Sequence, residues 1–473
     1  MSKFSDKCKL IMQENGTNVY RLSNSSSLER TTLQRMVTGK RLPGIDFVKQ
    51  FCKELRMSAA EEQQLMELYH IEQIGEDVYQ NRMIIRNLLR YLANLEQNFA
   101  LTDLEEAPLP GSAYPLTVHP GISYNTELVL FDIIEKAFQS DSPSYIYTNL
   151  PAVYGIFFHQ LRILCQRYPQ NQVSIEHLVA FQINASRSAH NLSILYHVLP
   201  PALSDKVRYF PWYHYSKVQG TDYLQSMFPY YIITQEAVLE ISGDFKTHLL
   251  HTDGAKNSIY TREFERIRGI SRPLLDQYTS PEDALTQYLS NTPSLVFSYV
   301  FEAQPCLQDM ITDADVNLLL EQNSLLLRLK DALEQQLSSF ASREIHGVFT
   351  RSGLDDFCQN GTLKGQIGAF LPPFLPAQRR QLLQNLLDRP ALHHRYMLSD
   401  DIVLPAHMNF EIYESKQINM IKIDDNLNIS FFVITESSIC DAFWEFASSF
   451  FGSDEMLSEE NTNQYIKKKL EQI

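Results

Sequence analysis

Residues 18–43 contain two short helical patterns separated by a serine-rich turn, and the second pattern stops at Gly39. Within the second pattern, Leu28, Leu33 and Met36 recur at helical spacing and predict the inner side of a helix. The opposite side carries side chains that donate or accept hydrogen bonds: Arg30, Thr31, Gln34 and Arg35. A helix with one apolar side and such groups outward can enter the major groove of DNA. We therefore expect these four residues to read base edges.

Three polar residues flank the two helical patterns. Asn18 precedes the first pattern, and Lys40 and Arg41 follow the second. Contacts to phosphates fix the register of a protein on the duplex, and they come from side chains of these types. The sequence predicts that Asn18, Lys40 and Arg41 contact the DNA backbone.

Residues 4–70 as a whole predict five short helices. The breaks between their apolar patterns fall at residues that commonly end or begin helices: Gly16, Asn18, Ser26, Ser27, Gly39 and Pro43. Ser58 and Glu61 form a capping-box sequence before the fifth helix. This part of the chain therefore predicts an all-α bundle.

The same segment resembles the Cro/C1-type (XRE-like) helix-turn-helix family over residues 4–70, without a gap. Thr32-Leu-Gln-Arg-Met-Val-Thr-Gly-Lys-Arg-Leu-Pro43 is similar to the family's Thr-Ile-Ser-Arg-Ile-Glu-x-Gly-Lys-Arg-x-Pro. The resemblance implies a DNA-binding helix-turn-helix domain of a bacterial transcription regulator. It also implies that Arg30, Thr31, Gln34 and Arg35 face the bases.

Several residues depart from the family pattern. Val19 stands where the family usually has a Gln that touches the DNA backbone, and Glu29 replaces a Ser or Thr at the start of the recognition helix. Ser26 and Ser27 replace the usual Leu-Gly of the turn. These differences bear on phosphate contacts and turn geometry, and they leave the target DNA sequence open.

Charge is unevenly distributed along the 473 residues. Residues 1–72 hold 11 Lys and Arg against 9 Asp and Glu, whereas the rest holds 30 against 47, within a net charge of −15. This balance argues against a protein that coats nucleic acid nonspecifically. A slightly basic module on an acidic body is typical of a small DNA reader joined to a separate domain.

Between the bundle and the body, seven residues follow one another at alternating spacings of four and three. All but Asn81 are apolar: Ile74, Val78, Asn81, Ile85, Leu88, Leu92 and Leu95. This spacing predicts a coiled coil that would join a homodimer. The alternative is one helix packed on the chain's own body. A Pro-rich stretch at 102–122 predicts a linker. The predicted domains are therefore residues 1–72, a connecting helix at 73–101, the linker at 102–122 and a large region at 123–473.

Residues 123–473 predict a mixed α+β region, in one or two lobes. Strands are expected at 145–147, 175–181, 230–241, 295–301, 408–414, 418–423 and 429–434. Helices are expected at 260–278, 313–340, 352–360, 376–388 and 439–450. No repeat of fixed period emerges, which disfavours a helical solenoid.

The same region contains few signs of chemistry. His248, His251 and Asp253 could form part of a metal site, but a third strong ligand is missing nearby. His393 and His394 are adjacent, so in regular structure their side chains diverge. The aromatic cluster at 209–215 favours core packing over a ligand pocket. We therefore expect no catalytic residues, no metal site and no cofactor.

Together these observations predict a multidomain protein with an all-α helix-turn-helix bundle and a mixed α+β C-terminal region. Its expected function is a sequence-specific, homodimeric transcription regulator of double-stranded DNA, with an unknown small-molecule or peptide effector acting on residues 123–473. The absence of a signal peptide or membrane span favours the cytoplasm. Two alternatives stay open: an enzyme of unknown class targeted by a helical head, and a protein-interaction module that does not bind DNA.

Overall fold

The computed structural model describes residues 2–95, 124–183, 188–216, 227–291, 297–307, 310–340, 343–388, 393–399, 402–414, 416–451, 453 and 455–473. The predicted linker at 102–122 lies outside the described residues. The chain divides into two compact units, Met1–Met83 and Ile84–Ile473.

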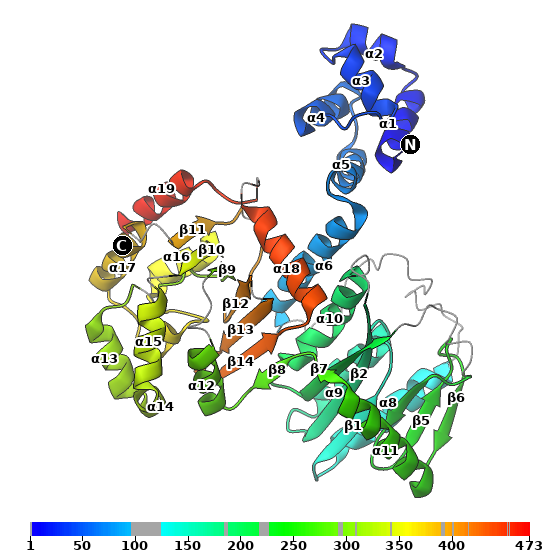
Figure 1. Cartoon of the computed structure of the whole chain (residues 1–473), viewed down its shortest axis with the longest axis vertical. Coiled ribbons are helices and arrows are strands. Elements are labelled where there is room, and N and C mark those ends of the chain that lie inside the picture. Colours follow the sequence, from blue (N-terminus) through cyan, green and yellow to red (C-terminus); the bar gives the residue numbers. More distant parts are fainter. Residues whose placement is uncertain are drawn as a thin grey trace. The chain divides into compact units, whose positions relative to one another are not determined.

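The smaller unit contains the five predicted helices, drawn in blue in Figure 1. They are α1 (Lys3–Glu14), α2 (Val19–Ser25), α3 (Arg30–Val37), α4 (Ile45–Glu54) and α5 (Ala59–Ile74). Ser58 and Glu61 form the predicted capping box, because each side chain reaches the backbone N–H of the other. Buried apolar residues from all five helices form one core, which includes Phe4, Leu22, Leu33, Phe51 and Leu65. The prediction of five helices is confirmed.

Helix α6 (Glu76–Ala93) crosses the border between the units. It is separated from α5 by Gly75, whose φ of +90° suits glycine and ends the preceding helix. Ile85, Leu88 and Leu92 are buried in the core of the larger unit. These three residues of the predicted coiled-coil seam are thus covered by the chain's own body. This agrees with the alternative interpretation, in which the segment is one helix packed on that body.

The larger unit is built on two seven-stranded sheets. The first has the order β6-β5-β4-β1-β2-β3-β7 and the second β11-β10-β9-β12-β13-β14-β8. The strands of the first sheet are β1 (Ser144–Thr148), β2 (Val173–Gln182), β3 (Arg208–Ser216), β4 (Tyr230–Ile233), β5 (Val238–Ile241), β6 (His248–His251) and β7 (Arg272–Pro273). Those of the second are β8 (Asp276–Tyr278), β9 (Phe297–Phe301), β10 (Glu344–Phe349), β11 (His393–Met397), β12 (Met408–Tyr413), β13 (Gln417–Ile423) and β14 (Ile429–Ile434).

Six strands of each sheet share one topology. In the first sheet β1, β2 and β3 are parallel neighbours, and β4, β5 and β6 follow antiparallel on the other side of β1. In the second sheet β9, β10 and β11 are parallel, and β12, β13 and β14 follow antiparallel beside β9. The larger unit therefore consists of two topologically equivalent halves. Strand β7 pairs with β3 at the edge of the first sheet. Strand β8, which follows β7 closely in the chain, pairs with β14 at the edge of the second sheet.

Helices flank both sheets (Figure 1). In the first half they are α8 (Tyr124–Gln139), α9 (Gly155–Arg167), α10 (Ser188–Ala202) and α11 (Gly254–Ile270). In the second they are α12 (Pro281–Asn291), α13 (Asp313–Gln322), α14 (Ser324–Arg328), α15 (Lys330–Phe340), α16 (Arg351–Asn360), α17 (Pro376–Leu387), α18 (Ser437–Phe450) and α19 (Glu459–Leu470). Each described helix is too short or too polar to span a lipid bilayer.

The two halves share one hydrophobic core. It contains Ile175 and Leu195 of the first half together with Phe410 and Phe446 of the second. Helices α10 and α18 pack on each other, and the side-chain amide of Asn191 in α10 donates to Oγ of Ser438 in α18 across 2.9 Å. The two halves therefore pack together as one compact unit.

The predicted mixed α and β character of residues 123–473 is confirmed, with differences in detail. The strand expected at 230–241 is the hairpin of β4 and β5. The helix expected at 260–278 is wrong beyond Ile270, because Pro273 cannot continue it and the chain enters β7 and β8. Strands β3, β6, β10 and β11 were not predicted. The protein is multidomain, with N-terminal helices followed by a mixed α/β region with two sheets.

Candidate nucleic-acid interface

Helix α3 is held in the smaller unit by one side. Leu33, Met36 and Val37 are buried in its core, and α3 packs against α1 and α2. The four predicted base-reading residues are all exposed: Arg30, Thr31, Gln34 and Arg35. Residues three and four apart are neighbours on a helix surface, as are Arg30 and Gln34, Thr31 and Gln34, and Thr31 and Arg35. The structure thus places these four side chains together on the solvent side of α3.

The turn between α2 and α3 is stabilised by the serines that replace the family's Leu-Gly. Oγ of Ser26 donates to the carbonyl of Leu22 across 2.7 Å and accepts from the N–H of Leu28 across 3.3 Å. The side-chain amide of Gln50 in α4 donates to Oγ of Ser27. Ser27 stands at the family's glycine, and it is not among the described non-glycine residues with a positive φ, so this turn needs no glycine there. The departure from the family pattern is compatible with a compact turn.

Helix α3 ends in a Schellman motif. The N–H of Gly39 donates to the carbonyl of Met36 across 3.1 Å, and the N–H of Lys40 donates to that of Arg35 across 2.9 Å. Gly39 has a φ of +67°, which this motif requires and which glycine adopts without strain. Lys40 and Arg41 are exposed directly after it. Two of the three residues predicted to contact phosphates therefore follow directly on the helix predicted to read bases.

Three residues at the helix starts have local roles. The side-chain oxygen of Asn18 accepts from the N–H of Arg21 across 2.9 Å and caps α2, so its amide nitrogen would be the donor to a phosphate. Val19 packs against the core. Glu29 is exposed, and its carboxylate accepts from Oγ1 of Thr32 across 2.5 Å, which holds its negative charge along α3.

Tyr20 is a surface residue that the sequence analysis did not single out. Its side chain is 59% exposed, and the guanidinium carbon of Arg30 lies 5.3 Å from the centre of its ring. This is the geometry of a cation–π contact. The ring thus limits the directions in which Arg30 can point. The sequence signal for this contact would have been an aromatic residue on the first of the two helices together with an arginine on the second.

Charge is separated within the smaller unit. Residues 18–41 contain five cationic residues and one acidic residue, Glu29: the cations are Arg21, Arg30, Arg35, Lys40 and Arg41. Helix α5 contains four glutamates and no lysine or arginine. The excess of positive charge is thus concentrated in the segment that carries the predicted DNA contacts.

The residues of the predicted partial metal site have separate partners. Nδ1 of His248 lies 3.0 Å from Oγ1 of Thr126, and Nε2 of His251 lies 3.7 Å from a carboxylate oxygen of Glu240. Asp253 caps α11 by accepting from the N–H of Ala255. These contacts give each side chain a structural role.

The adjacent histidines His393 and His394 diverge, as expected. His393 is buried and His394 partly exposed. His394 instead lies beside His346 of β10, with Glu344 close by. In the part of the chain that the structure describes, these three residues are the one group whose potential ligand atoms all lie within 4.8 Å of one another. Sequence spacing could not show this group, because it depends on the pairing of β10 with β11.

The aromatic cluster at 209–215 is strand β3, and its alternate residues Tyr209 and Tyr213 are buried. The Tyr209 hydroxyl lies 2.5 Å from Nδ1 of His177, whose Nε2 lies 2.6 Å from the carbonyl oxygen of Leu150. Burial lowers the pKa of His177 to about 4. The cluster is part of the core, as the sequence favoured.

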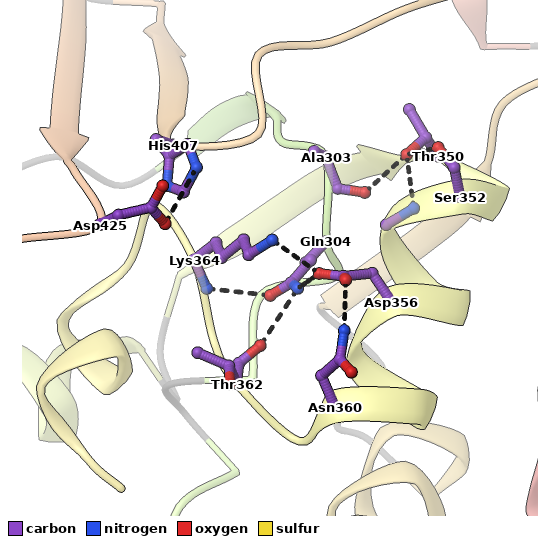
Figure 2. A network of polar contacts seen from close by, with 11 residues as sticks. Ala303, Gln304, Thr350, Ser352, Asp356, Asn360, Thr362, Lys364, His407 and Asp425 are labelled. Carbon is purple, nitrogen blue, oxygen red and sulfur yellow. Dashed lines mark hydrogen bonds and ion pairs between the residues drawn. The ribbon is translucent and has the colours of Figure 1, made fainter. Parts of the chain in front are cut away.

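The carboxyl ends of β9 and β10 are occupied by a polar network (Figure 2). The side chain of Gln304 donates to Asp356 and to the carbonyl of Thr362, and accepts from the N–H of Lys364. Thr350 caps α16. Open α/β sheets often bind ligands at this edge. Here protein groups fill it, since a Cβ on Gly353 would lie 1.9 Å from the carbonyl oxygen of Ala303.

Two hollows are lined by described residues of the larger unit. One is a cavity of about 30 Å³ with Tyr91, Phe158 and His197 in its wall, far below the roughly 300–1,000 Å³ of typical ligand pockets. The other is an open groove of about 470 Å³ whose lining includes Gln384 and Lys467 of α17 and α19. Neither is lined by the aromatic cluster of β3.

Comparisons with known proteins gave few matches. No family model matches the chain, and no curated relative does. Two crystal structures of yeast tyrosyl-DNA phosphodiesterase, one of a mutant, each share 11% identity with it. The alignment with the mutant covers 66% of this chain and 86% of that chain with a TM-score of 0.22; the other covers 64% and 85% with a TM-score of 0.21. A TM-score at this level does not establish a shared fold, and such identity does not indicate function.

Proposed function

We propose that the chain is a sequence-specific DNA-binding protein that regulates transcription and reads double-stranded DNA with α3. The observation that carries this proposal is the shared exposure of Arg30, Thr31, Gln34 and Arg35 on a helix whose other side is buried. Arginine and glutamine can each make paired hydrogen bonds to base edges in the major groove.

The residues around α3 support the same assignment. Lys40 closes the Schellman motif and Arg41 directly follows it, and Asn18 caps α2. In this proposal the three contact phosphates on either side of the bases and fix the angle of α3 in the groove. The excess of cations in residues 18–41 supplies the charge that phosphate binding needs.

The larger unit would supply regulation and assembly. We propose that the regulator acts as a homodimer, with two copies of α3 about one DNA turn apart, roughly 34 Å. Because Ile85, Leu88 and Leu92 are covered within the chain, the dimer contact would lie outside this seam. An effector would act on residues 123–473.

The test is selection from a library of random duplexes, with the full chain at physiological salt. We expect enrichment of a two-fold symmetric sequence whose half-sites are separated by one helical turn. Enrichment of a single asymmetric site would retain DNA reading and reject the dimer. A protein-interaction module would enrich no sequence, and that result would overturn the proposal.

A further inference from the structure

Three ligand-type side chains meet on one face of the second sheet. His346 of β10 and His394 of β11 are direct partners in the parallel pairing of the two strands. Glu344 lies two residues before His346, and residues two apart in a strand point to the same face. The pairing register therefore gathers one carboxylate and two imidazoles from neighbouring strands.

The distances among these groups are short. A carboxylate oxygen of Glu344 lies 2.9 Å from Nε2 of His346, and the ring centres of His346 and His394 lie 4.6 Å apart. One potential ligand atom from each residue lies within 4.8 Å of the others. Bonds of about 2.0–2.2 Å to a tetrahedral zinc ion place ligand atoms roughly 3.4 Å apart. Small side-chain rotations would bring the three atoms to that spacing.

The surroundings suit a bound ion. The side chains of His346 and Glu344 are 20% and 46% exposed, so an ion can enter from solvent. Phe297, Tyr299 and Phe451 pack around the His346 ring, and such an apolar shell limits the access of water to a metal site. Nδ1 of His346 is buried, and no described residue hydrogen-bonds to it. Nε2, on the other side of the ring, faces Glu344 and is the nitrogen placed to bind the ion.

We propose that Glu344, His346 and His394 bind one divalent transition-metal ion, with zinc as the best fit. Two imidazoles and one carboxylate are a ligand set that zinc accepts, and three protein ligands leave a coordination position for a solvent molecule. The site is independent of the DNA-binding proposal, because its residues all belong to the second sheet. The competing interpretation is a His–Glu ion pair stacked on a second histidine, which binds no ion.

The test uses the full chain purified without a histidine tag, stripped with a chelator and titrated with Zn²⁺ by calorimetry. Binding of Co²⁺, followed by visible absorbance, reports the coordination geometry. We expect one Zn²⁺ per chain. Glu344→Gln, His346→Asn and His394→Asn should each weaken binding by more than about tenfold, since even residues that only support a metal ligand have effects of that size.

The matched control is His407→Asn. His407 also faces a carboxylate, with Nε2 3.5 Å from Asp425 (Figure 2), but it is not a member of the three-residue group. This variant should bind Zn²⁺ like the wild type. Circular dichroism of each variant checks folding, and Glu344→Gln changes a half-exposed side chain that the core does not need. If the wild type binds no stoichiometric Zn²⁺, or if folded Glu344→Gln and His346→Asn bind it unchanged, the proposal is overturned.

Discussion

The N–H of Lys40 donates to the carbonyl oxygen of Arg35 across 2.9 Å, and this bond ties a predicted phosphate contact to a predicted base contact. It closes the Schellman motif that ends α3. Because Arg35 is in the last turn of α3, the chain leaves the helix with Lys40 close to that end. The bond therefore makes the position of one contact depend on that of the other.

Gly39→Ala should destabilise the smaller unit by about 1–2 kcal/mol, because alanine is strained at the φ of +67° that Gly39 adopts. An added Cβ would also lie 3.2 Å from Oγ of Ser5. Gly44→Ala is the control, since Gly44 has a φ of −67° and open space around it. Denaturant unfolding measures both variants. Equal stability of the two would show that the motif does not hold the end of α3.

Tyr20→Ala should weaken binding to the enriched duplex by about two- to fivefold, the equivalent of one exposed cation–π contact. The Tyr20 ring lies beside the guanidinium of Arg30 and would restrict its motion before binding. Tyr20→Phe keeps the ring and should bind like the wild type. Fluorescence anisotropy measures the affinities. A loss in Tyr20→Phe equal to that in Tyr20→Ala would instead assign the effect to the hydroxyl.

The larger unit should lose stability as pH falls from about 6.5 to about 4. His177 stays neutral in the folded state because burial lowers its pKa to about 4, whereas the unfolded chain takes up a proton near the ordinary value of 6.5. The unfolded state thus binds more protons in this window, which removes about 3 kcal/mol of stability by its lower end. Denaturant unfolding at several pH values measures this slope. His177→Gln should remove only its own share of this slope, because burial also lowers the pKa of His197 to about 4. An unchanged slope in that variant would contradict the assignment.

Gly353→Ala should destabilise the larger unit by about 1–3 kcal/mol through overpacking. The added Cβ would collide with the backbone of Ala303, which leads into the network of Figure 2. Gly254→Ala, at the start of α11, has no neighbouring atom within 4 Å and serves as the control. Thermal unfolding compares the two. If Gly353→Ala has the same melting temperature as Gly254→Ala, α16 does not approach the loop after β9 as closely as described.

The helices of the smaller unit could be predicted because their signals are local. Asn18, Gly39 and the pair Ser58 and Glu61 each mark a helix end through contacts within a few residues. Exposure of the four residues on α3 followed from the same helical spacing. Tyr20 was missed because its contact with Arg30 joins two helices.

The equivalent halves of the larger unit could not be predicted, because they are related by strand order and not by a sequence repeat. Strand β10 contains Glu344, His346 and Gly347, and β3 contains Pro211, so neither follows a simple strand pattern. The group around His346 depends on the register between β10 and β11, whose paired residues His346 and His394 lie far apart in the sequence. No metal site was expected from the sequence, because a third ligand is missing near His248 and His251 and because His393 and His394 are adjacent and diverge.

The seam at 74–95 shows why heptad spacing alone does not define a partner. The same pattern fits a second chain or the chain's own body, and Ile85, Leu88 and Leu92 are buried in the body. The choice between the two depends on the apolar surface that the body presents to α6, for example at α10, where Tyr196 lies beside Tyr91 of α6. Heptad spacing contains no information on that surface.

The central claim is that α3 reads bases while the residues after it bind phosphates, and one set of affinities tests it most directly. Arg35→Ala, Lys40→Ala and the control Lys53→Ala, an exposed lysine of α4, are compared by fluorescence anisotropy on the enriched duplex, on a duplex with one substituted base pair and at several salt concentrations. We predict that Arg35→Ala loses about 1–3 kcal/mol and relaxes the preference at one position, and that Lys40→Ala weakens binding to all duplexes and lowers the salt slope by about one. Lys53→Ala should leave the base preference unchanged. Wild-type affinity and preference in both Arg35→Ala and Lys40→Ala would contradict the account.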